Sequence, residues 1–123
     1  MEKIMATQGR ILAALDAINR LRKDITGRDA LNLYRMKNKL TEYANFEAEE
    51  EQKLVDKYNG TIAEDGRVLI DGAENQAAFV KEYVQLREME CDIDAEKVKL
   101  SLDDHPAITM EDIEQLDGFV EFV

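Results

Sequence analysis

The sequence predicts a mainly helical α+β fold: a long antiparallel, coiled-coil-like helical hairpin joined to a small module of two short β-pairs and two shorter helices. Two long stretches, residues 3–24 and 29–58, carry apolar residues at steps of three, four and seven, as amphipathic helices do. After Gly60, short alternating runs are separated by turn residues. Because a narrow apolar stripe needs a covering partner, the two long helices are expected to pack together within residues 3–58.

The first helix is expected over residues 3–24. Its isoleucines recur at seven-residue intervals, a spacing typical of a coiled-coil seam. Gly27 can adopt a positive φ, and Thr26 or Asp29 can cap the next helix, so a tight reversal is expected there. The seam isoleucines are Ile4, Ile11, Ile18 and Ile25.

The second helix is expected over residues 29–58, a stretch without proline or glycine that ends near Gly60, a residue suited to a C-terminal cap. Near its middle the apolar stripe thins to alanines, and an acidic run begins at Glu47. We interpret this run as a solvated helix face. The alternative, a metal site, would need a Glu-x-x-His spacing that the chain lacks. The run comprises Glu47, Glu49, Glu50 and Glu51.

Residues 59–123 are expected to form the smaller module. Residues 61–63 and 67–70 flank Asp65 and Gly66, which indicates a β-hairpin. A helix is expected over residues 71–89, with Asp71 and Glu74 as a capping box. Its apolar residues are expected to form one broad face; they are Ala77, Ala78, Val80, Tyr83, Val84 and Leu86. Residues 91–94 and 97–100 alternate apolar and polar side chains, so we expect them to pair and to join the first hairpin in one small sheet.

A last short helix is expected after Thr109, whose side chain is placed to cap it, with Asp112 in the capping-box position. Gly118 argues against a regular helix to the end of the chain. This segment is expected to carry apolar side chains into the core. They are Ile113, Leu116, Phe119, Val120 and Phe122.

Size and charge narrow the classes of function. The 123 residues suit a single domain, 1–123. A net charge of −11 repels phosphate backbones and anionic lipid, so we expect neither direct nucleic-acid binding nor membrane binding. With one cysteine and no signal-peptide-like or membrane-spanning apolar run, the expected location is the cytoplasm, the host cell's if the chain is phage-encoded.

Few residues suggest chemistry. His105, the only histidine, lies in an expected turn, where an exposed or capping role is favoured. Cys91 begins an alternating strand and is expected to be a buried small hydrophobe. Asp92, Asp94 and Asp103 are a weak candidate for a divalent cation, because the glycine and final glutamate of an EF-hand loop are missing. We therefore expect no enzyme activity, no cofactor and no metal.

Protein contact is the favoured class of function. The seven-residue seam and the acidic middle of the second helix suit binding to an unidentified protein partner, including a second copy of the chain. Alternatively, both stripes pack on each other inside one monomer. A different possibility is an acidic inhibitor that occupies the nucleic-acid channel of a host nucleic-acid-binding or defence protein. The candidate interaction residues are Ile4, Ile11, Ile18, Leu33, Leu40, Glu47, Glu50 and Glu51.

The order of elements from residue 28 to 120 resembles a family of small phage and prophage proteins of unknown function from Gram-positive bacteria. The resemblance lies in the long helix and the spacing of the segments after it; its residues are Tyr58 to Gly60, Asp65 and Gly66, Phe79 to Leu86, Cys91 to Ile93, Val98 to Leu100, Ile108, Thr109, Ile113 and Leu116. It implies a phage accessory role and transfers no functional residue. Helices joined through β-hairpins are also similar to prefoldin subunits. A helix, 71–89, intervenes here between the two β-pairs, so a chaperone role is not implied.

Overall fold

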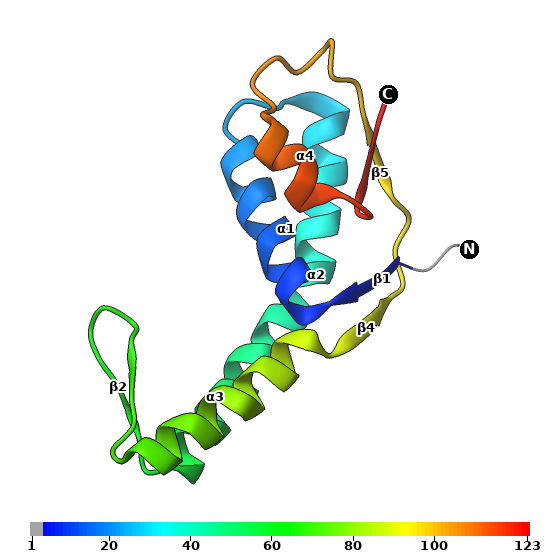
Figure 1. Ribbon diagram of the computed structural model, residues 1–123. Coiled ribbons are helices and arrows are strands. Elements are labelled where there is room, and N and C mark those ends of the chain that lie inside the picture. The colour runs from blue at the N-terminus through cyan, green and yellow to red at the C-terminus, as the bar shows by residue number, and fades with distance from the viewer. Residues whose placement is uncertain (1–3) are drawn as a thin grey trace.

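The structure, a computed structural model, describes residues 4–123 and has the expected mainly helical α+β fold (Figure 1). The elements in chain order are β1 (Ile4–Thr7), α1 (Gln8–Leu21), α2 (Gly27–Lys57), β2 (Thr61–Ile62), β3 (Val68–Leu69), α3 (Ala73–Glu88), β4 (Glu90–Ile93), β5 (Val98–Leu100), α4 (Met110–Leu116) and β6 (Val120–Phe122).

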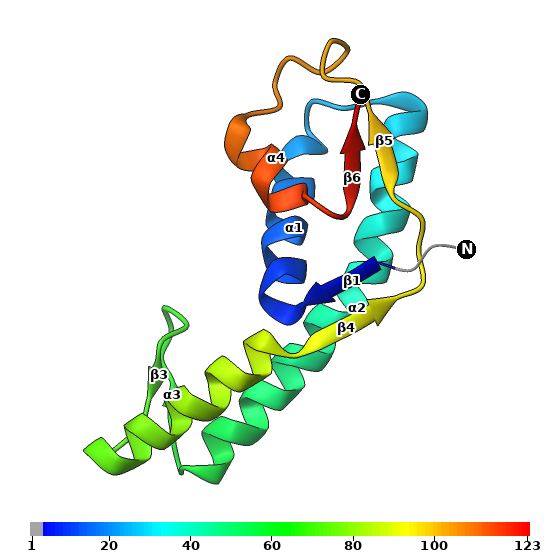
Figure 2. The same cartoon turned by 45° about the vertical axis from the view of Figure 1, so that its right-hand side comes forward.

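Helix α2 runs through both of the two parts into which the molecule can be divided. Its 31 residues span about 46 Å. Helix α1 packs along its first half, whereas α3 packs along its second half (Figures 1 and 2). We call residues 4–44 and 89–123 the head, and residues 45–88 the arm. The arm therefore consists of the second half of α2, the β2–β3 hairpin and α3.

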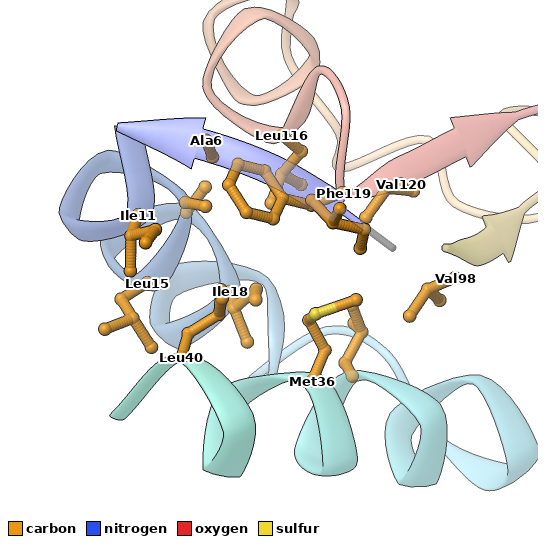
Figure 3. Packing of buried hydrophobic residues seen from close by; sticks show 14 of the residues in the cluster. Ala6, Ile11, Leu15, Ile18, Met36, Leu40, Val98, Leu116, Phe119 and Val120 are labelled. Atoms are coloured by element: carbon orange, nitrogen blue, oxygen red, sulfur yellow. The ribbon is translucent and has the colours of Figure 1, made fainter. Parts of the chain in front are cut away.

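The expected helical hairpin is confirmed. Helices α1 and α2 run antiparallel, joined by residues 22–26 (Figure 2). In the head core, Ile11 and Ile18 of α1 lie opposite Met36 and Leu40 of α2, and Phe119 closes the cluster from the C-terminal segment (Figure 3). The two apolar stripes thus cover each other within one chain, which removes their apolar side chains from water.

The expectation that the first helix begins at residue 3 is wrong for residues 4–7, and residue 3 lies outside the described residues. Ile4–Thr7 is strand β1, which pairs antiparallel with β4, Ile4 opposite Ile93 and Thr7 opposite Glu90. Within these four residues the burial alternates, since Ile4 and Ala6 are buried and Met5 is exposed. Ile4 satisfies both the heptad and the strand period, so its spacing did not distinguish them.

The expected single sheet is also wrong, because the described strands form three separate two-stranded sheets. They are β1–β4 and β2–β3, both antiparallel, and β5–β6, which is parallel. Residues 91–94 and 97–100 are extended and bury alternate side chains as predicted, but each pairs with a segment near a chain end. Alternation fixes which side chains face the core, but it carries no information about the partner strand.

The hairpin predicted at Asp65 and Gly66 is confirmed. Thr61 pairs with Leu69 and Ile62 with Val68. Gly66 has φ +86°, a left-handed conformation that favours glycine. The Arg67 N–H donates to Asp65 Oδ1 at 3.1 Å, which holds the turn.

Helix starts were predicted with mixed success. The capping box of α4 is confirmed: the Asp112 N–H donates to Thr109 Oγ1, and the Thr109 N–H donates to Asp112 Oδ2, both at 3.1 Å. The capping box proposed for Asp71 and Glu74 is wrong, because α3 starts at Ala73 with Gly72 at its N-cap and no side-chain cap.

The last helix ends earlier than the apolar pattern suggests. Helix α4 stops at Leu116, and Gly118, with φ +88°, turns the chain into β6. Phe119 and Val120 therefore reach the core from a turn and a strand rather than from a helix.

Candidate functional site

The apolar residues predicted for interaction lie inside the head. Four of them are fully buried and Ile4 is 4% exposed, all in one cluster with residues of β4, β5 and β6. The seven-residue seam is thus covered by the chain itself. The four fully buried residues are Ile11, Ile18, Leu33 and Leu40.

The acidic run of α2 is only partly the solvated face that the sequence suggested. Glu47 is 5% exposed, and its Oε1 lies 3.3 Å from Arg87 Nη1 on α3. Arg87 Nη1 also donates to the Tyr83 hydroxyl at 3.3 Å. The interpretation is wrong for Glu47 because α3 packs over this face of α2 and brings a cation with it. A buried carboxylate is tolerated when it is paired in this way.

The other members of the run differ in exposure. Glu49 is exposed, whereas Glu50 and Glu51 are half-buried. Glu50 pairs with Lys53 one helical turn later, at 3.6 Å. Burial raises the pKa of Glu51, and the nearby Glu47 carboxylate raises it further. Only part of this run is therefore available to a partner.

The two residues with potential chemistry are held by the fold. His105 Nε2 lies 2.8 Å from Asp29 Oδ2 and ties the loop before α4 to the first turn of α2. Cys91 is 8% exposed, which confirms the expected buried position. Burial raises the pKa of the Cys91 thiol, so the less nucleophilic protonated form is favoured at neutral pH.

The weak cation hypothesis gains no geometric support. Across residues 4–123, no group of three or more His, Cys, Asp or Glu side chains is placed to hold a metal ion. The Asp92 carbonyl instead accepts a hydrogen bond from the Tyr43 hydroxyl at 2.9 Å.

An exposed apolar face on α3 is a candidate contact surface. It was not distinguished from the buried face of the same helix in the sequence. Phe79 and Leu86 are buried, but Val80 is 56% and Val84 is 44% exposed. The exposed side chains follow one another at steps of four, three and four residues, the spacing of a helix seam. We call this face the α3 stripe; it consists of Ala73, Ala77, Val80 and Val84.

Helix α3 carries two separate apolar faces where one broad face was expected. Phe79 and Tyr83 pack toward α2, and the buried Leu86 lies on the same side of the helix, whereas the α3 stripe lies roughly 120° away around the helix axis. Its four and three residue steps were present in the sequence, so plotting the two sets separately would have found it.

A second candidate surface is an open groove of about 750 Å³ in the head, between α2 and residues 94–99. Four cations line it, Arg35 and Lys39 from α2 and Lys97 and Lys99 from the β5 segment. Within the described part of the chain, none of the four forms an ion pair, although Arg20, Lys57 and other cations elsewhere do. We call this feature the α2–β5 groove.

Carboxylates interrupt the cations of the groove, and its floor is apolar. The carboxylates are Glu42, Asp94 and Glu96. Met36 and Val98, both buried, contribute to the lining. The groove depends on the fold, since its two walls are more than fifty residues apart in sequence, and no local motif indicated it.

Comparison of the chain with protein-family models, with curated proteins and with solved structures gave no match. Among the described residues, no helix has the length and apolar character that crossing a bilayer requires.

Proposed function

We propose that this protein is a non-catalytic accessory protein of a phage or prophage that works by protein contact, and that it self-associates through the α3 stripe. The observation that carries the contact proposal is the exposure of Val80 and Val84 on a helix whose other apolar seam is already packed on α2. The phage origin is supported by the resemblance in the order of elements described above.

A second copy is the favoured occupant because the stripe is complementary to itself. In an antiparallel two-fold pair, a residue i that faces residue j implies that j faces i. A register in which Ala77 faces Val80 also places Ala73 opposite Val84, so that each small side chain meets a larger one. The same register brings Glu74 close to Lys81 of the other copy, an attractive contact at the rim.

The arm has a physical reason to be covered. Its own cluster of buried residues is only Val55, Ile70 and Phe79 among the residues described, while Ile62, Leu69, Val80 and Val84 remain exposed. Exposed apolar side chains that line up on one helix face, as Val80 and Val84 do, are a feature of protein contact surfaces. Burying these side chains against a second arm would remove them from water.

Sedimentation velocity over a range of protein concentrations tests the proposal. We expect a concentration-dependent dimer for the wild type and a monomer for Val80→Glu/Val84→Glu, with circular dichroism unchanged. Met110→Glu/Val123→Glu is the matched control, because it adds the same charge at two exposed apolar positions of the head. A wild-type protein that sediments as a monomer at every concentration would overturn self-association.

The excess of carboxylates supports a different candidate, an acidic inhibitor of a host nucleic-acid-binding or defence protein. Affinity capture from a host lysate distinguishes the two. A basic protein that is retained at low salt and released by moderate salt would favour the inhibitor, because such contacts are screened within about 10 Å at 0.1 M salt.

A further inference from the structure

We propose that the α2–β5 groove binds an extended acidic segment of another protein, which adds as a strand to the free edge of β5. This surface lies in the head, away from the α3 stripe, so the proposal does not depend on self-association.

One edge of strand β5 has no strand partner among the described residues. Strand β5 pairs with β6 on one side, through the Val98 N–H to the Phe119 carbonyl at 3.0 Å and the Val123 N–H to the Leu100 carbonyl at 2.9 Å. Because hydrogen-bonding direction alternates along a strand, the main-chain groups of Lys99 point to the opposite edge. The carbonyl of Lys97, the residue before β5, points there too, since it is trans to the Val98 N–H. Among the described strands, none pairs there. An extended peptide can add to such an edge through main-chain hydrogen bonds.

The charge of the groove selects the occupant. Lys97 and Lys99 lie along the free edge, and Arg35 and Lys39 stand on the facing wall one helical turn apart. Lysine on an edge strand repels another lysine-bearing edge and so discourages indiscriminate strand pairing. The same lysines attract a strand that carries carboxylates, which gives the edge specificity as well as protection.

A peptide fits better than a nucleic acid. A phosphate backbone would meet Glu42, Asp94 and Glu96 between the cations, and it would approach a chain of net charge −11. An extended peptide can place its carboxylates only at chosen positions. Its alternate side chains point to opposite faces, so apolar residues can cover Met36 and Val98 while acidic residues meet Lys97 and Lys99.

The probe is a fluorescein-labelled peptide of about seven residues in which glutamate and valine alternate. Anisotropy with the full chain should give saturable, salt-sensitive binding. Amide shifts of residues 97–99 and of the facing part of α2 in ¹⁵N NMR spectra should locate the peptide in the groove. Absence of binding, or shifts confined to other regions, would overturn the proposal.

Charge-reversal variants test whether the cations of the groove bind the peptide. Lys97→Glu/Lys99→Glu should weaken binding by roughly tenfold or more, because like charges then face each other. Arg35→Glu, on α2, gives the same readout without altering the strand. Lys23→Glu/Lys53→Glu, at two exposed positions outside the groove and the α3 stripe, makes the same change in net charge and should leave binding unchanged.

Two further probes separate the parts of the proposal. Two peptides are compared, one N-methylated at every glutamate and the other at every valine, because only one of these two sets of N–H groups can face β5. One of the two should lose binding and the other should keep it; equal binding of both would exclude strand addition. A single-stranded oligonucleotide that competes as well as the peptide would show a general polyanion site and would contradict an acidic peptide as the occupant.

Discussion

The head and the arm share one helix, yet they are held together differently. Among the described residues, the head cluster contains nineteen buried apolar residues and the arm cluster contains three. The first half of α2 carries large aliphatics that pack on α1 and the short strands. The second half carries more carboxylates, and α3 joins it through the small cluster around Phe79 together with ion pairs and hydrogen bonds. The head is therefore stabilised mainly by burial of apolar area, whereas the arm depends more on specific polar pairs.

This difference predicts unequal local stability. Regions with few buried apolar contacts open at lower free energy than the core to which they are attached. The arm also carries the α3 stripe, so the region that most needs a partner is the region with the smaller core of its own.

The largest expected effect is in the head. Phe119 is fully buried, so Phe119→Ala should lower the free energy of unfolding by about 4 kcal/mol. Phe79→Ala makes the same change in the arm cluster, where Phe79 is 8% exposed and contacts Tyr58 and Tyr83, and about 2 kcal/mol is expected because the surroundings can collapse more easily.

Urea denaturation measures both losses, and hydrogen exchange locates them. The Phe79 variant should speed exchange of α3 amides and leave α1 protected. Equal losses with exchange raised throughout would mean that the head and the arm unfold as one unit.

The next effect concerns the ion pair between the arm helices. Arg87→Met leaves the buried Glu47 carboxylate without its cation, and a loss of about 2 kcal/mol is expected, reduced because the Arg87 side chain is partly exposed. In the double variant Glu47→Met/Arg87→Met most of this loss should be recovered, since a buried ion pair and an apolar pair of similar size differ little. Thermal unfolding compares the variants, and a double variant less stable than the single one would show that Glu47 is stabilised by groups other than Arg87.

A stabilising change is expected where β1 passes into α1. Gln8 is fully buried, and neither its side-chain nitrogen nor its oxygen has a hydrogen-bond partner within the described residues. Gln8→Met keeps the size of the side chain and removes the buried amide, so a gain of about 1 kcal/mol is expected. Gln76→Met is the control, because the Gln76 amide donates to the Ile70 carbonyl at 2.8 Å and its removal should not stabilise. A lower melting temperature for Gln8→Met would indicate that an ordered water satisfies the amide.

The smallest effect is a pH dependence in the arm. Hydrogen bonds from Lys57 and from the Tyr58 hydroxyl to Glu82 lower the pKa of that carboxyl. Because this pKa is lower in the folded state than in the unfolded state, the ionised carboxylate stabilises the arm above the ordinary pKa of glutamate. This stabilisation is lost as the pH falls through the pKa of the folded state. The protection of α3 amides, corrected for the intrinsic pH dependence of amide exchange, should therefore fall more steeply on acidification in the wild type than in Glu82→Gln. Identical profiles would assign acid sensitivity to other carboxyls.

Features encoded over a few residues were predictable, and features that depend on distant partners were not. The steps of Leu33, Met36 and Leu40 identified α2, and Thr109 with Asp112 identified the start of α4. The pairing of β5 with β6 was hidden because a strand's alternation is the same for any partner. Glu47 shows the same limit, since only the position of Arg87 on another helix distinguishes a buried ion pair from a solvated face.

The two candidate surfaces also differ in whether neighbouring residues or distant partners encode them. The α3 stripe was present as a period in the sequence and was merged with a neighbouring period, so it was missed by interpretation. The α2–β5 groove has no sequence signal, because its walls meet only after the head has folded.

Because α2 is continuous, its length also sets the distance between the head and the outer end of the arm. Since no turn separates the head from the arm, the separation between them is set by helical rise, about 10 Å for each additional seven residues. Matched seven-residue insertions in α2 and α3 would move the hairpin outward by that amount and rotate it by only about 20°. The length of two helices, rather than the chemistry of any side chain, would then set how far from the head the outer end of the arm can make contact.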